Sequence, residues 1–252
     1  RRSTATTAHA HSPGLAKRES ALTLSRMVHF TLFGIPVYIR PSFWVVLAIF
    51  GGALSISSVE DLIYPALFVI AGFVAILSHE MGHALVGRKL GGGQQTIVLE
   101  LFGGLTSSHG MQLTRGGRAL MILAGPMMTL LLGIISLWLT WNIVAPVMTS
   151  YNLNFWDLAI SPFTAALISP KLYILSCLIM IGEWWTILNL LPIYPLDGGQ
   201  LIRSPRKVFM TGFITAILIG LLSFQLFHGY FIPIFMALFA YSNYREYKNA
   251  PF

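Results

Sequence analysis

Long apolar runs separated by short polar segments are the main pattern along this chain of 252 residues. A helix needs about 20 apolar residues to cross the hydrocarbon core of a bilayer. The pattern therefore predicts about six transmembrane helices, of which the first and the last are the shortest. They cover residues 42–58, 62–87, 119–145, 172–191, 208–227 and 230–244.

The composition supports a membrane protein. Hydrophobic residues make up 55% of the chain and charged residues only 10%, whereas a soluble domain carries roughly 25% charged residues. Too few polar residues remain to cover a water-soluble globule, so we predict an all-α polytopic membrane protein. The net charge of +7 does not indicate a nucleic-acid partner, because the Lys and Arg residues stand between and outside the apolar runs.

The positions of the basic residues also predict an orientation. Of the 16 Lys and Arg residues, only Lys171 falls in the segments that follow the first and third apolar runs. Cytoplasmic segments are the ones that carry Lys and Arg. We therefore expect both termini, and the segments after the second and fourth runs, on the cytoplasmic side of a bacterial or archaeal cell membrane.

The N-terminal segment differs from the rest of the chain. Residues 1–26 are rich in Ser, Thr, Ala and Arg, and Glu19 is their single acid. This composition is typical of a disordered arm, a targeting segment or cloning-derived residues. We expect one transmembrane domain over residues 27–252, with its core at about 59–205. The single Cys177 excludes an intramolecular disulfide.

Three ionisable residues interrupt the second apolar run near its predicted cytoplasmic end: His79, Glu80 and His83. Such side chains at membrane depth cost a few kcal/mol and therefore indicate function. His79 and His83 are four residues apart, so on a helix they share one face. Two imidazoles placed in this way can bind one Zn²⁺, and Glu80 can deprotonate a water on the metal. The H-E-x-x-H pattern therefore predicts a metalloprotease-type zinc site.

A catalytic zinc ion needs a third protein ligand. Asp197 lies in "NLLPIYPLDGG", residues 189–199, where Pro192 and Pro195 cannot continue a helix. Broken helix at membrane depth is tolerated only where it is buried in protein or lines a cavity. Because Asp197 should lie at the depth of His79, we predict that it is the third ligand. The other candidates are Glu100, His109 and Glu183.

These motifs together resemble the site-2 protease family of intramembrane zinc metalloproteases. The similarity extends over roughly residues 30–205, and three further stretches follow the family's order. They are "GIPVYIRPSFW" (34–44), "LFGGLT" (101–106) and "AGP" (124–126). No PDZ-like or cystathionine-β-synthase-type stretch is recognisable, so the chain resembles the compact, sporulation-type branch.

The resemblance implies a zinc-dependent intramembrane endopeptidase that cleaves a transmembrane or membrane-associated segment of a protein. Its implied partners are this membrane-anchored substrate, the lipid bilayer and a regulatory membrane protein, with no nucleic acid. Glu80 would be the general base, and one Zn²⁺ per chain would be bound by His79, His83 and Asp197. The implied substrate-binding residues are Asn189, Pro192, Gly103 and Gly104.

A short membrane-associated β loop is expected between the second and third helices. "TIVLELFGG", residues 96–104, is typical of a strand with glycine at its end. A transmembrane substrate hides its carbonyl groups in helical hydrogen bonds, so it must unwind before cleavage. We expect the edge of this strand to pair with the unwound segment by strand addition.

Two alternatives remain at this point. The chain could be a catalytically silent or transport-type membrane protein with a structural metal site, although such a site has no need of Glu80 as a base. It could also be a membrane zincin whose third ligand is Glu183 rather than Asp197. The "PLDGG" stretch favours Asp197, and the roles of Glu183 and His109 stay open.

Overall fold

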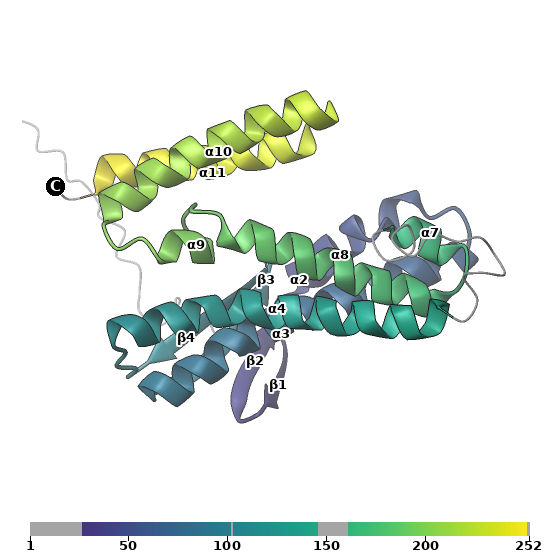
Figure 1. Ribbon diagram of the computed structural model, residues 1–252, viewed down its shortest axis with the longest axis horizontal. Helices are drawn as coiled ribbons and strands as arrows, with labels where there is room; N and C mark the ends of the chain where they lie inside the picture. Colours follow the sequence, from purple (N-terminus) through teal and green to yellow (C-terminus); the bar gives the residue numbers. More distant parts are fainter. Residues whose placement is uncertain (1–26, 102, 146–160, 251–252) are drawn as a thin grey trace, which may run out of the picture.

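The computed structural model describes residues 27–101, 103–145 and 161–250. Within these ranges the chain forms one small sheet and a set of long helices (Figure 1). The strands are β1 (Val28–Leu32), β2 (Ile35–Ile39), β3 (Gln94–Glu100) and β4 (Gly103–His109). The helices are α2 (Pro41–Phe50), α3 (Ile63–Gly91), α4 (Arg115–Val144), α7 (Pro162–Ala166), α8 (Pro170–Leu190), α9 (Asp197–Gln200), α10 (Pro205–Phe227) and α11 (Phe231–Asn249), with short 3-10 turns at η1 (Ala53–Ser55) and η2 (Glu60–Leu62). The N-terminal arm expected over 1–26 lies outside the described residues.

The number of membrane spans differs from the prediction. Four helices in the described ranges are long and apolar enough to cross a membrane. They are Glu60–Gly91, Arg115–Val144, Pro170–Leu190 and Pro205–Leu226. The first predicted span forms only the 10-residue helix α2, which is about 15 Å long at 1.5 Å per residue. The last predicted span lies in α11, whose C-terminal half is polar from Asn243 to Lys248. Six spans are therefore not confirmed.

The β structure is larger than the loop that the sequence predicts. The sheet has the order β1-β2-β3-β4, in which β2 and β3 are parallel and the other pairs are antiparallel. Burial alternates along β2, and its inward residues join the inward residues of β3 and the apolar side of α3 in one core. The sheet thus packs against the helix that carries His79, and β4 forms one of its two edges.

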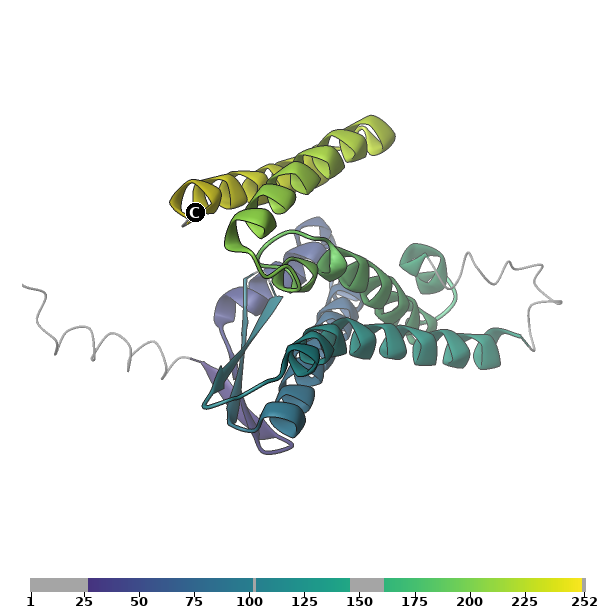
Figure 2. The ribbon, with the colours of Figure 1, turned by 60° about the vertical axis from the view of Figure 1, so that its left-hand side comes forward.

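The helices α3, α4 and α8 lie side by side (Figures 1 and 2). The Thr114 hydroxyl caps α4 by accepting a hydrogen bond from the Gly117 N–H at 3.1 Å. Helix α8 ends at Leu190, because Pro192 disfavours helical backbone at the residue before it. Gly82 allows α3 to pack closely against α4, because a Cβ at this position would overlap the backbone of α4. Small residues permit this kind of close packing between membrane helices.

Helices α10 and α11 form an antiparallel hairpin. Both views show it on the side of α8 and α9 that faces away from β1 and β2 (Figures 1 and 2). An apolar cluster joins the hairpin to the segment after α8, and Ile193 of that segment is fully buried in it. The hairpin therefore packs on the segment that leads into α9.

Candidate metal centre

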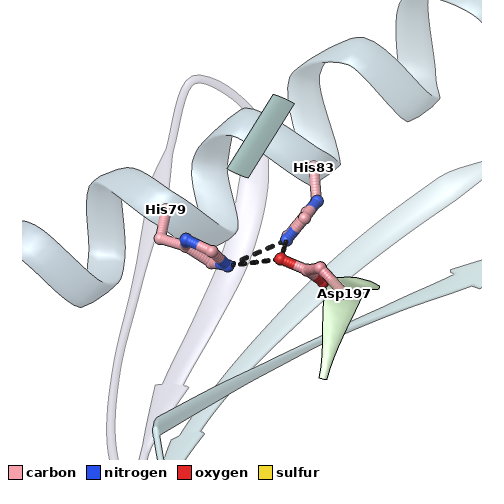
Figure 3. A group of neighbouring side chains, drawn as sticks. All are labelled: His79, His83 and Asp197. Atoms are coloured by element: carbon pink, nitrogen blue, oxygen red, sulfur yellow. Dashed lines mark hydrogen bonds and ion pairs between the residues drawn. The ribbon is translucent and has the colours of Figure 1, made fainter. Parts of the chain in front are cut away.

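Three side chains from two separate segments of the chain point toward one another (Figure 3). His79 and His83 lie one turn apart on α3, and Asp197 is the first residue of α9. Their exposed fractions are 2%, 8% and 7%. The four-residue spacing on a helix aligns the imidazoles, and the break after α8 turns the carboxylate toward them. This is the grouping that the sequence predicts.

The distances within the cluster are short. The Oδ2 of Asp197 lies 3.0 Å from the Nε2 of His79 and 3.3 Å from the Nε2 of His83. The two Nε2 atoms are 3.0 Å apart. Ligands that share one tetrahedral zinc ion at 2.0–2.1 Å lie roughly 3.3 Å from one another. The cluster therefore has the dimensions of a three-ligand zinc site.

The hydrogen bond of His83 selects the tautomer that a metal needs. Its Nδ1 lies 2.8 Å from the carbonyl oxygen of Met121. A carbonyl oxygen can only accept, so Nδ1 carries a proton, and in the neutral imidazole the Nε2 lone pair faces Asp197. Nε2 of His83 and Oδ2 of Asp197 are then two acceptors in contact, an arrangement that a shared cation stabilises. The donor set therefore fits a divalent metal ion.

Helix α4 closes one side of the cluster. Gly125 faces both imidazoles, and a Cβ at this position would overlap the His83 ring and come within 2.9 Å of the His79 Nε2. Met121, one turn earlier, supplies the carbonyl that holds His83. The "AGP" stretch therefore acts through close packing, because its glycine leaves the room that the two rings occupy.

The carboxylate of Glu80 is held by the edge strand. Glu80 is 5% exposed, and its Oε2 accepts a hydrogen bond from the Thr106 hydroxyl at 2.7 Å. Gly104, two residues earlier on β4, has no side chain where a Cβ would overlap the Glu80 carboxylate. Sheet and helix thus meet at Glu80, one residue after His79.

An apolar cavity of about 710 Å³ lies next to this region. Ile76 of α3, Trp185 of α8 and Gly103 of β4 contribute to its wall, together with residues of the α10–α11 hairpin. Trp185 also connects the cavity to the cluster, because its ring centroid lies 6.4 Å from that of His79. The cavity can hold apolar side chains beside the edge strand.

Comparison with known proteins identifies the family. Residues 67–212 match the description "Peptidase family M50", and this range contains Glu80 and the three clustered residues. The chain belongs to peptidase family M50. The match covers more than half of the chain and runs from the first turns of α3 into the first part of α10.

Individual relatives of this M50 chain are zinc enzymes by name. It is 30% identical over 176 residues to a zinc metalloprotease of Methanocaldococcus jannaschii, covering 69% of this chain and 44% of the relative. It is 29% identical over 186 residues to a candidate zinc metalloprotease of Synechocystis sp., covering 69% of this chain and 42% of the relative. The chain therefore spans less than half the length of these two curated relatives.

A solved structure shares the fold of this M50 chain. The site-2 protease from Methanocaldococcus jannaschii matches with a TM-score of 0.55 at 22% identity. The match covers 88% of this chain and 95% of that one. The overall fold of the chain is therefore one already seen in a site-2 protease.

The substrate-binding residues predicted from the sequence lie on three parts of the fold, namely α8, the loop after it and β4. Asn189 is buried near the end of α8, where its amide donates to the Trp185 carbonyl at 2.9 Å. Pro192 is half-buried at the start of the following loop. Gly103 lines the cavity, whereas Asn189, Pro192 and Gly104 are not among its lining residues. These residues therefore do not form one common pocket in the described part of the chain.

The alternative ligands lie away from the cluster. Glu183 is exposed on α8 and His109 is exposed at the far end of β4. Glu100 forms an ion pair with Arg40 at 2.7 Å. In the described ranges, the three-residue group able to hold a metal consists of His79, His83 and Asp197.

The structure adds contacts that the sequence alone does not indicate. These are the bond from Thr106 to Glu80, the carbonyl of Met121 on His83, and the packing of Trp185 beside His79. Thr106 ends the "LFGGLT" stretch and Met121 lies just before "AGP", so both motifs contained a signal. The pairing itself depends on how sheet and helices pack, which spacing along the chain does not specify.

Proposed function

We propose that this M50 chain is a zinc-dependent endopeptidase that cleaves a transmembrane or membrane-associated segment of a protein substrate. The observation that carries the proposal is the cluster of His79, His83 and Asp197 with Glu80 beside it. The two histidines and Glu80 lie on a helix long and apolar enough to span a bilayer. Ionisable groups at such depth are expensive unless they serve a function. A hydrolytic zinc site accounts for all four residues.

The chemistry follows from ordinary zinc hydrolysis. His79, His83 and Asp197 would hold the ion, which supplies Lewis acidity and lowers the pKa of bound water toward about 7. Glu80 then takes the proton of the attacking water and returns it to the leaving amine. The hydroxyl of Thr106 keeps the Glu80 carboxylate in one orientation through its bond to Oε2.

Substrate presentation is proposed for the edge of the sheet. Strand β4 pairs with β3 on one side only, so its other edge can accept an extended segment by strand addition. Gly103 and Gly104 have no side chains to obstruct this approach near Glu80. The neighbouring apolar cavity offers space for side chains of a membrane segment. Asn189 and Pro192 are proposed to flank the unwound peptide from the opposite side.

Zinc content in purified chains tests the ligand assignment. The parent chain and Glu80→Gln in detergent should each hold about one zinc ion, because Glu80 is a base and not a ligand. Asp197→Ala should hold much less. Glu183→Ala is the matched control, since it also removes a carboxylate but from an exposed position on α8, and it should keep the metal.

Cleavage of a single-span membrane peptide, with a helix-destabilising residue in its apolar segment, tests the activity. The parent and Glu183→Ala should cleave it, and Glu80→Gln should not, although it holds zinc. Full zinc in Asp197→Ala would contradict the ligand set. Equal cleavage by Glu80→Gln and the parent would contradict the role of the base.

A further inference from the structure

A buried amide on α11 contacts the loop that carries Asp197. Asn243 is 1% exposed. Its Nδ2 donates to the carbonyl oxygen of Tyr194 at 2.7 Å and to that of Phe239, one turn earlier, at 2.9 Å. Tyr194 lies three residues before Asp197 in the sequence. The bond therefore links the α10–α11 hairpin to the segment that presents the third residue of the metal cluster.

The surroundings fix the orientation of this amide. Both carbonyl groups beside Nδ2 can only accept hydrogen bonds, so the amide nitrogen has to face them. The amide oxygen then turns toward α10, where Gly212 leaves room for it, because a Cβ on this glycine would overlap Asn243 Oδ1. The same Cβ would come within 3.3 Å of the Cα of Ile193. Helix α10, helix α11 and the loop thus meet at Gly212.

The loop needs such a partner because its backbone is not helical. A peptide carbonyl at membrane depth costs several kcal/mol when it is left without a hydrogen bond. The backbone donors within the loop are few, since Pro192 and Pro195 have no N–H. The amide of Asn243 supplies the donor that Tyr194 requires. Without it, the loop can be expected to shift toward another donor and to carry Asp197 with it.

We propose that Asn243 is a positioning residue that holds the Asp197 loop in the geometry required for zinc binding. The proposal rests on the function proposed above. It differs from a purely structural role, in which Asn243 stabilises the hairpin and leaves the metal affinity of the folded protein unchanged. Outer partners of metal ligands commonly change metal affinity by about 10- to 100-fold when they are removed.

The first test compares zinc affinity in Asn243→Leu with that of the parent chain. Affinity is measured in detergent on monodisperse protein by competition with a chromophoric chelator. Asn243→Leu keeps the branching at Cγ but removes the donor, and we expect zinc binding about 10-fold weaker. Asn142→Leu is the matched control, because Asn142 also donates to a carbonyl one turn earlier but lies exposed on α4.

A second pair of variants, both on α10, tests the same contact without changing Asn243 itself. Gly212→Ala leaves Asn243 in place but forces its amide to move. Gly220→Ala, two turns later, meets Met236 Cβ at 3.3 Å and does not contact the loop. Alanine favours helix in both cases, so loss of helical propensity cannot explain a difference between them. We expect weaker zinc binding in Gly212→Ala only.

The outcomes separate this inference from the proposed function. Weaker zinc binding in Asn243→Leu and Gly212→Ala, with both controls unchanged, supports the positioning role. Affinities within twofold of the parent in both variants would overturn it. If Asn243→Leu does not yield folded protein, Asn243→Ala, which also removes the donor but adds no volume, takes its place in the comparison. A parent chain that binds no zinc contradicts the proposed function itself, and this inference fails with it.

Discussion

At the residue scale, Gly125 shows how a missing side chain can shape a metal site. A Cβ at this position would overlap the ring of His83, whereas one at Gly133 on the same helix has 3.9 Å to its nearest neighbour. Both substitutions to alanine should favour helix by about 0.8–1.0 kcal/mol. We predict that Gly125→Ala retains far less than one zinc ion per chain and that Gly133→Ala retains the parent amount, measured by elemental analysis of purified protein. Parent-like zinc binding in Gly125→Ala would show that the rings have more freedom than the packing indicates.

The residues proposed to bind the metal and to activate water are the ones that the sequence can predict. His79, Glu80 and His83 are fixed by their spacing on one helix, and Asp197 is marked by the prolines and glycines around it. The structure brings the two histidines and Asp197 together as expected. The sequence does not predict the contacts of Thr106, Gly125 and Asn243, because these contacts join segments far apart in the chain. A single threonine, glycine or asparagine carries no local pattern that indicates such a contact.

At the scale of elements, the Thr106 hydroxyl joins β4 to α3 at the proposed base, because it lies 2.7 Å from the Oε2 and 3.2 Å from the carbonyl oxygen of Glu80. Thr106→Val keeps the shape and strand preference of the side chain but removes the hydroxyl that Glu80 accepts from. We predict unchanged zinc content and a kcat about 10-fold lower, with KM little affected, since the loss concerns orientation of the base in the transition state. Cleavage of the single-span peptide by the variant gives both constants.

Thr106→Ser is the matched variant for this contact because it restores a hydroxyl without the methyl group. It should recover most of the lost kcat. A Thr106→Val protein with parent-like kcat would mean that Glu80 does not need β4 for its orientation. A rise in KM with unchanged kcat would instead assign Thr106 to substrate binding at the strand edge.

The elements themselves were predictable where one periodic pattern dominates. The spans α3, α4, α8 and α10 follow long apolar runs. The run over 42–58 forms a shorter α-helix than its length suggests, because Gly51 and Gly52 follow α2 directly and Gly52 has a positive φ of 87° that continues no helix. Strand β2 was missed as well, although buried and half-buried residues alternate along it. Its parallel partner β3 lies more than fifty residues later, beyond the reach of local patterns.

At the scale of the whole molecule, the ends of the described long helices define two opposite sides of the protein. Strand β1 and the following turn lie near the C-terminal end of α3, where the Arg88 guanidinium donates to the Phe33 carbonyl at 2.8 Å. The chain then runs back along α3 through the short helix α2 to η2, before the long helices begin. At the other end of the sequence, α11 returns beside α10, and the Arg206 guanidinium lies 5.3 Å from the ring centroid of Tyr247. The first strands, the loop before α10 and the end of α11 therefore share one side.

This arrangement makes the proposed orientation testable with single cysteines. Cys177 is buried, so Cys177→Ser provides a background without reactive thiols. In intact cells, a membrane-impermeant maleimide should label Val59→Cys, which replaces a residue 82% exposed at the start of the first long span. Arg203→Cys and Lys248→Cys should react only after the membrane is permeabilised, because basic residues gather on the cytoplasmic side. The reverse labelling pattern would mean that the protein has the opposite orientation in the membrane, with the metal site nearer the outer face. Labelling of Lys248→Cys together with Val59→Cys would mean that α11 does not return across the bilayer beside α10.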